Sequence, residues 1–140
     1  MPPLARPVVA MVVLALAASA CHTATPQEER ASLCADLVAL RATIAFLRDP
    51  APGARVGEVR GDLDKLDPTV TKAHTSDLVD DAIGQQLFDA QKDYRSLLNG
   101  IGDDDRFSTV GAGGQGEDLW GAYEAVSEQL GCGESLVSAG

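Results

Sequence analysis

The stretch from Leu33 to Leu47, LCADLVALRATIAFL, carries the pattern that decides the fold. Its apolar residues recur at alternating spacings of four and three positions, so they lie along one side of an α-helix. A seam of this kind packs lengthwise against other helices. We therefore predict a helix from about Glu28 to Arg48, which ends before the proline-rich turn that follows. The seam consists of Leu33, Leu37, Leu40, Ile44 and Leu47.

A second seam predicts a helix from about Ala54 to Ala73, although Pro68 lies inside it. Proline in this position either kinks a helix or begins a new one, which Asp67 would then cap. Because the apolar register passes through the proline unbroken, we expect one kinked helix. The seam consists of Val56, Val59, Leu63, Leu66, Val70 and Ala73.

Two more helices are predicted in the second half of the chain. The third follows the polar turn at residues 75–77 and ends at Asn99-Gly100, since glycine just past the last apolar residue is a common helix stop. The fourth runs from about Glu117 to Leu130. Between these two helices, residues 102–116 form a long loop that is rich in aspartate and glycine, and we expect its glycine-rich run, Gly111–Gly116, to be flexible. Strand-like alternation of useful length is absent, so the predicted fold is all-α.

The cysteines give the topology of the predicted bundle. Cys34 lies in the first turns of the first helix, and Cys132 lies just after the fourth. In an up-down-up-down four-helix bundle these positions are at the same end. We therefore predict a Cys34–Cys132 disulfide, whose Cα atoms would be about 5.5 Å apart. Residues 31–140 would form this helical bundle domain.

Composition limits the partners of such a domain. The chain has 140 residues, enough for one domain, and a formal net charge of −10. This charge repels nucleic acids and anionic lipid head groups, so neither is expected as a direct partner of the folded domain. A cationic protein or peptide is an allowed partner. Alternatively, the acidity only keeps the domain soluble.

The first 20 residues have the three-part design of a secretory signal peptide. Arg6 supplies the positive charge, and the apolar stretch Val8–Ala18 is too short to cross a bilayer, which needs about 20 residues. The small residues Ala18-Ser19-Ala20 satisfy the rule for ordinary signal cleavage. That cleavage would release a soluble, secreted protein that begins at Cys21.

The segment Leu16-Ala17-Ala18-Ser19-Ala20-Cys21 also resembles the lipobox of bacterial lipoproteins, although Ala18 stands where leucine is usual. The resemblance implies that Cys21 carries diacylglycerol, that the signal is removed before it and that the new N-terminus is acylated, for example with palmitate. It also implies an extracytoplasmic protein held at the cell membrane by a lipid anchor, and the composition looks like that of small helical lipoproteins of high-GC Gram-positive bacteria.

Lipidation also leaves Cys34 and Cys132 as an even pair in an oxidising compartment. Residues 21–30 would then comprise the lipidated cysteine and a flexible tether, because His22–Arg30 lacks apolar periodicity.

The residues that could bind metals or cofactors do not form known motifs. Neither His22 nor His74 has a histidine partner at ligand spacing, so we predict no metal site there. The run Asp103–Asp105 lacks the pattern of a calcium-binding EF-hand and is interpreted as a solvated loop. The run Gly111–Gly116 resembles a phosphate loop only in its glycine content. The sequence therefore predicts no cofactor and no catalytic residue.

Two aromatic residues on the fourth helix, Trp120 and Tyr123, could border a pocket, but aromatics at this spacing are more often core residues. The favoured function is a non-enzymatic lipoprotein of the cell envelope that binds a protein or peptide. The alternatives are a bundle that holds a small ligand or metal cation, and a soluble secreted protein. The sequence leaves the oligomeric state open.

Overall fold

The structure is a computed structural model that describes residues 24–110 and 114–133. The described part contains four α-helices and one short 3-10 helix, joined by turns. The predicted signal peptide, Cys21 and His22 lie outside the described residues, as does part of the glycine-rich run. The elements are α2 (Pro26–Arg48), α3 (Val56–Thr75), α4 (Asp81–Leu97), η2 (Phe107–Thr109) and α5 (Gln115–Leu130).

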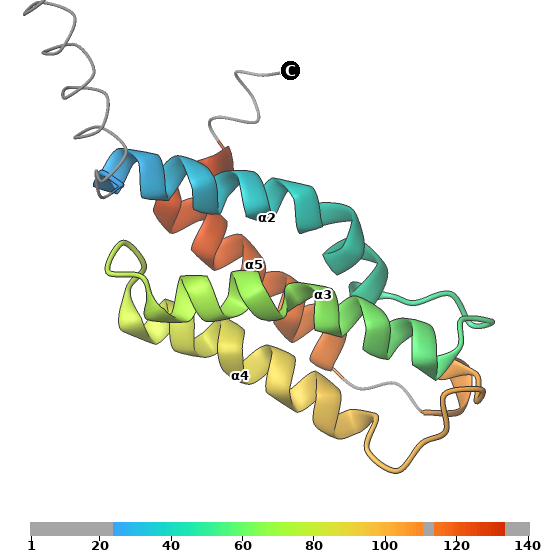
Figure 1. Cartoon of the computed structure of the whole chain (residues 1–140). Helices are drawn as coiled ribbons and strands as arrows, with labels where there is room; N and C mark the ends of the chain where they lie inside the picture. The colour runs from blue at the N-terminus through green and yellow to red at the C-terminus, as the bar shows by residue number, and fades with distance from the viewer. Residues whose placement is uncertain (1–23, 111–113, 134–140) are drawn as a thin grey trace, which may run out of the picture.

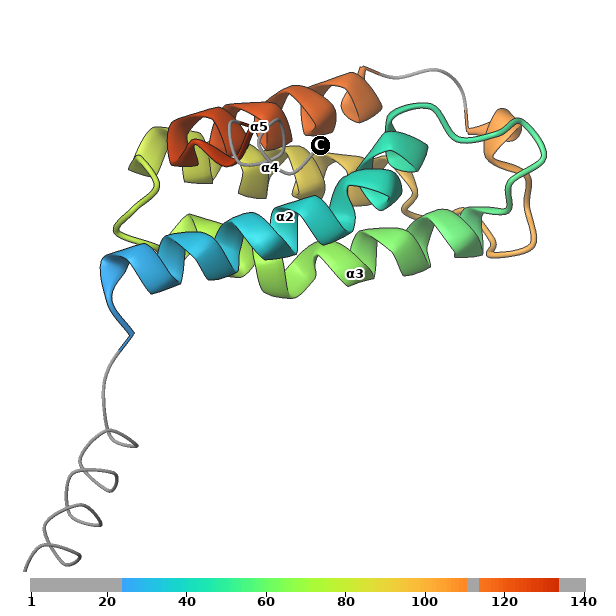
Figure 2. The same cartoon turned by 90° about the horizontal axis from the view of Figure 1, so that it is seen from above.

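The four helices form an up-down-up-down bundle (Figures 1 and 2). Each helix packs against the next one along the chain, and α5 returns to lie beside α2, which closes the bundle. The α2–α3 and α3–α4 connections are short, as is typical of antiparallel neighbours in this architecture, whereas the α4–α5 connection is long. The predicted all-α bundle is therefore confirmed.

The core is made of the apolar seams that the sequence predicts. Leucine and valine side chains from all four described helices meet in one cluster and exclude water, which is the main stabilising contribution in a domain of this size. Two tyrosine hydroxyls are buried in this cluster, and each donates a hydrogen bond to a carbonyl of α2. Tyr94 donates to Leu47 at 2.7 Å and Tyr123 to Leu37 at 2.6 Å.

The disulfide between Cys34 and Cys132 joins the first turns of α2 to the end of α5, with the Cα atoms 5.3 Å apart. The predicted pairing is thus confirmed. At the same end of the bundle, Arg30 Nε donates to the Leu130 carbonyl, one of the carbonyls that a helix C-terminus leaves without a partner. Gly131 adopts a φ of 73°, the left-handed conformation that ends α5.

The first helix begins earlier than expected. Thr25 is its N-cap, since the Thr25 side chain accepts a hydrogen bond from the Glu28 amide at 3.2 Å, and Pro26 occupies the first turn, where proline is well tolerated. Residues 26–30 are therefore helical, whereas the sequence predicted a tether as far as residue 30. Apolar periodicity could not reveal this turn because it faces solvent.

Pro68 lies inside one continuous helix, as predicted. A proline removes a backbone donor and disturbs the preceding turn. The buried amide of Gln91 on α4 packs at this point, where its Nε2 donates to the Leu63 carbonyl at 2.9 Å and to Asp67 at 2.7 Å. Gln91 therefore ties α4 to the turn of α3 that precedes the proline.

The first half of the segment between α4 and α5 is exposed, as predicted for Asp103–Asp105, but it is held in place by contacts with α3. Residues 101–107 pair with the start of α3, because the amides of Val56 and Gly57 donate to the carbonyls of Asp105 and Asp103. Arg60 donates to the carbonyls of Leu98 and Ile101, at 2.6 and 2.5 Å, and pairs with Asp103. These contacts are long-range, so no local pattern signals them.

Candidate binding groove

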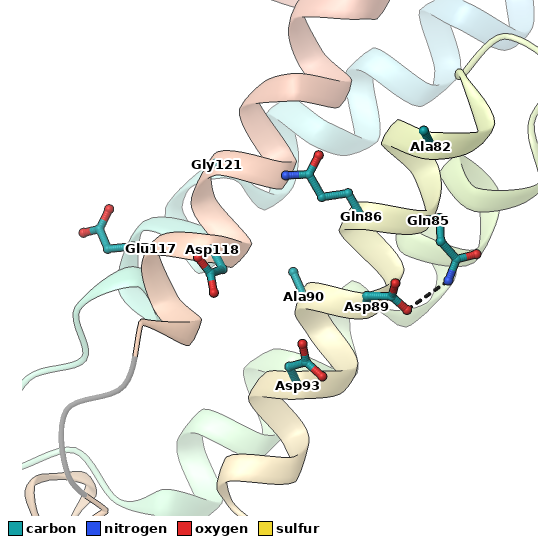
Figure 3. A pocket seen from close by; sticks show the side chains of 9 residues that line it. All are labelled: Ala82, Gln85, Gln86, Asp89, Ala90, Asp93, Glu117, Asp118 and Gly121. Atoms are coloured by element: carbon teal, nitrogen blue, oxygen red, sulfur yellow. Dashed lines mark hydrogen bonds between the residues drawn. The ribbon is translucent and has the colours of Figure 1, made fainter.

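A groove of about 640 Å³ lies between α4 and α5 (Figure 3). Six of its lining residues come from α4 and three from the first turns of α5. We call it the α4–α5 groove. It is lined by Ala82, Gln85, Gln86, Asp89, Ala90, Asp93, Glu117, Asp118 and Gly121.

The groove is open because the residues that face each other across α4 and α5 here include small ones, which leave the space between the helices unfilled. Ala82 and Ala90 lie two turns apart on the same side of α4. Across from them, a Cβ placed on Gly121 would meet nothing within 4 Å. The sequence thus leaves open space along the helix pair where larger side chains would fill it.

Four acidic residues line this space, and within the described part of the chain no lysine, arginine or histidine does, although the Glu117 carboxylate itself points away from α4 (Figure 3). Asp93 on α4 and Asp118 on α5 project toward the same space from opposite sides (Figure 3). Neither side chain has a hydrogen-bond or ion-pair partner within the described residues. Glu117 and Asp118 also occupy the first turn of α5, where the helix dipole favours negative charge. The groove is therefore a negatively charged surface, on which the carboxylates of Asp93 and Asp118 are not neutralised by another described residue.

The other two carboxylates have partners. Glu117 accepts a hydrogen bond from Arg48 Nε at 2.9 Å, and this contact raises the pKa of Arg48. Asp89 accepts from Gln85 Nε2 at 2.9 Å, and Gln85 Oε1 lies 2.8 Å from His74 Nε2 on α3. His74 therefore helps to orient a groove carboxylate through Gln85. The His74 ring also stacks on Phe88, with the ring centroids 4.7 Å apart.

A second, smaller cavity of about 180 Å³ lies beside α2, on a different face of α5. We call it the Trp120 pocket. Tyr123 is a core residue as predicted, but Trp120 is only half-buried and forms part of the pocket wall. The pocket is lined by Arg41, Trp120, Tyr123, Glu124, Ser127, Glu128 and Gly133.

Of the residues that the sequence singled out, Cys34 and Cys132 form a disulfide, and Trp120 and Tyr123 lie side by side in the wall of one pocket. Asp103, Asp104 and Asp105 do not converge on one point: Asp103 pairs with Arg60, the Asp104 carbonyl accepts from Arg55, and the Asp105 side chain accepts from the Gly102 amide. Sequence reasoning missed the α4–α5 groove and gave a pocket at Trp120 and Tyr123 only as the less favoured interpretation. The four-residue spacing of Asp89 and Asp93 hints at an acidic stripe, but only the pairing of α4 with α5 makes it a groove.

Within residues 24–110 and 114–133, no three histidine, cysteine or carboxylate side chains come together in a group that could hold a metal ion. In the same residues, no helix is both long and apolar enough to span a bilayer.

Comparison with known proteins gives no family. No family model matches the chain, and neither the curated proteins nor the solved structures include a significant match.

Proposed function

We propose that the protein is a lipid-anchored, non-enzymatic binding module of the extracytoplasmic cell envelope, and that its α4–α5 groove binds a cationic segment of another protein. The observation that carries the proposal is the groove's charge. Among the described residues, four acidic residues and no basic residue line the groove, and Asp93 and Asp118 have no hydrogen-bond or ion-pair partner there. A lysine- or arginine-rich segment would neutralise this charge, and complementary charge also speeds association.

The dimensions of the groove support a peptide segment as the ligand. Its volume of about 640 Å³ lies within the range of about 300–1,000 Å³ that is common for ligand pockets, and it is open along the helix pair. A single cation would find no cluster of three ligands within the described residues. An extended chain could instead place several charges along the row formed by Asp89 and Asp93, one turn apart on α4.

Binding can be tested with a fluorescently labelled oligolysine peptide, with an oligoglutamate peptide as the negative probe. We expect saturable binding of oligolysine that weakens as salt is added, because salt screens exposed charges. The double variant Asp93→Asn, Asp118→Asn should weaken binding about threefold to tenfold, since each exposed ion pair is worth about 0.2–1 kcal/mol.

The matched control is Glu58→Gln, Asp77→Asn, which removes the same net charge outside the groove. If the control weakens oligolysine binding as much as the groove variant does, the domain attracts cations only through its overall charge, and the groove is not the site.

The lipid anchor is tested separately. Cells that express the full chain would be fed an alkyne-bearing palmitate analogue, and labelling of the protein would be compared with that of Cys21→Ala. We expect label and membrane association for the natural chain and neither for the variant. An unlabelled protein in the culture medium would instead support the alternative of a soluble secreted protein cut after Ala20.

A further inference from the structure

The Trp120 pocket has a rigid aromatic wall. The Trp120 and Tyr123 ring centroids are 5.9 Å apart, and the Arg48 guanidinium lies 5.1 Å from the Trp120 centroid, within cation–π distance. The hydroxyl of Tyr123 is used by its hydrogen bond to Leu37, so the ring has little freedom to turn. A wall that is already ordered costs little conformational entropy when a ligand binds.

Charged groups of both signs border this wall. Arg41 comes from α2, while Glu124 and Glu128 lie one turn apart on α5. None of the three side chains makes a hydrogen bond or ion pair with another described residue. Most basic side chains of the bundle do have such a partner, as Arg48, Arg60 and Arg95 illustrate. The pocket therefore presents one unpaired cation and two unpaired carboxylates beside an aromatic surface.

The volume of the pocket limits its ligand to a small molecule. At about 180 Å³ it is smaller than the roughly 300–1,000 Å³ typical of sites for drug-sized ligands. A folded peptide segment does not fit, whereas a molecule of amino-acid size does.

We propose that the Trp120 pocket binds a free amino acid with an aromatic or large apolar side chain. In this arrangement Arg41 binds the carboxylate, because a guanidinium offers paired donors in a geometry that matches two carboxylate oxygens. Glu124 and Glu128 bind the ammonium group. The side chain of the ligand lies against Trp120 and Tyr123, where aromatic rings favour offset or edge-to-face contacts. This site is separate from the α4–α5 groove, and the proposal does not depend on the proposed function.

Trp120 is the only tryptophan in the chain, so its fluorescence reports on this pocket directly. The probes are phenylalanine, phenethylamine, which lacks the carboxylate, and 3-phenylpropionate, which lacks the ammonium group. None of the three contains an indole that would mask the signal. We expect a saturable change with phenylalanine and binding at least about tenfold weaker for each analogue, a difference of about 1.4 kcal/mol. Equal affinities for the three probes, or no saturation by phenylalanine, would overturn the proposal.

Two variants test which pocket residue binds the carboxylate of the ligand and which binds its ammonium group. Arg41→Gln should weaken the binding of phenylalanine and of 3-phenylpropionate at least about fivefold, because both carry a carboxylate. The binding of phenethylamine, which has no carboxylate, should be unchanged. Glu128→Gln should weaken the binding of phenylalanine and phenethylamine and leave the binding of 3-phenylpropionate unchanged. The control is Lys92→Gln, which removes an exposed basic residue of α4 that is not part of the pocket. All three positions are exposed, so folding should be preserved. The assignment is wrong if Arg41→Gln and Lys92→Gln have the same effect.

Discussion

Gly116, in the first turn of α5, lies against the carbonyl oxygen of Arg48, the last residue of α2. A Cβ at position 116 would overlap that oxygen and would also lie only 2.9 Å from the Leu47 carbonyl oxygen. The C-terminus of one helix thus meets the N-terminus of another, an arrangement in which their dipoles attract.

Gly116→Ala should therefore destabilise the protein by about 1–3 kcal/mol, the usual cost of overpacking a tight contact. The measurement is the free energy of unfolding in urea. The control is Gly121→Ala on the same helix, where the added Cβ meets open space. Alanine should stabilise that site by about 0.5–1 kcal/mol because it is the better helix former. Similar losses at both positions would contradict the close packing at Gly116.

Tyr94→Phe removes the hydroxyl that donates to the Leu47 carbonyl. We expect a loss of about 1–3 kcal/mol, since the carbonyl is left buried without that donor. The substitution should also change the response to alkaline pH. Burial raises the pKa of Tyr94 above its ordinary value of about 10.

The sign of the pH effect follows from this pKa. Above pH 10 the unfolded chain loses the tyrosine proton while the folded chain keeps it, so the stability present below pH 10 falls as the pH rises. Circular dichroism during alkaline titration should show that Tyr94→Phe is less sensitive to pH in this range than the natural protein. Burial acts in the same direction on the pKa of Tyr123, so the double variant with Tyr123→Phe should be less sensitive still.

The disulfide should contribute a large part of the free energy of unfolding. Cys34 and Cys132 are 98 residues apart, and closing a loop of that length contributes about 4.7 kcal/mol in the chain-entropy model. Replacing both with alanine should lower the free energy of unfolding by about 2–5 kcal/mol. Addition of a reductant should have little further effect on this variant, whereas it should lower the stability of the natural protein. An unchanged urea midpoint in the double variant would count against the bond.

Arg60 should hold the segment after α4 against α3. Arg60→Met leaves the Leu98 and Ile101 carbonyls without their guanidinium donor, and we expect a loss of about 1–3 kcal/mol together with faster hydrogen exchange over residues 101–105. Arg55→Met is the matched control. Loss of its one exposed hydrogen bond to the Asp104 carbonyl should change the free energy of unfolding by no more than about 0.5 kcal/mol. Equal effects would show that the Arg60 contacts are not specific.

The seams of Leu33–Leu47 and Val56–Ala73 were predictable because apolar periodicity is a local signal that burial preserves. The disulfide followed from the topology. The first turn of α2 was missed because its order comes from the Thr25 cap. The contacts that hold the segment after α4 were not foreseen because they come from distant residues of α3. The α4–α5 groove could not be predicted at all, since it depends on which faces of two helices meet. The residues that line the groove look, in sequence, like an ordinary polar helix surface, whereas Trp120 and Tyr123 were noticed but were expected to be core residues.

The position of Thr25 also sets how far the domain can stand from a bilayer. If Cys21 carries lipid, only residues 22–25 separate it from the first helical residue, and five fully extended steps span at most about 18 Å. The bundle would then stay close to the bilayer surface and could not extend far from it. Another membrane-bound protein would meet it by diffusion in two dimensions, within a layer hardly thicker than the domain itself. A freely dissolved partner would have to come down to the surface to be captured.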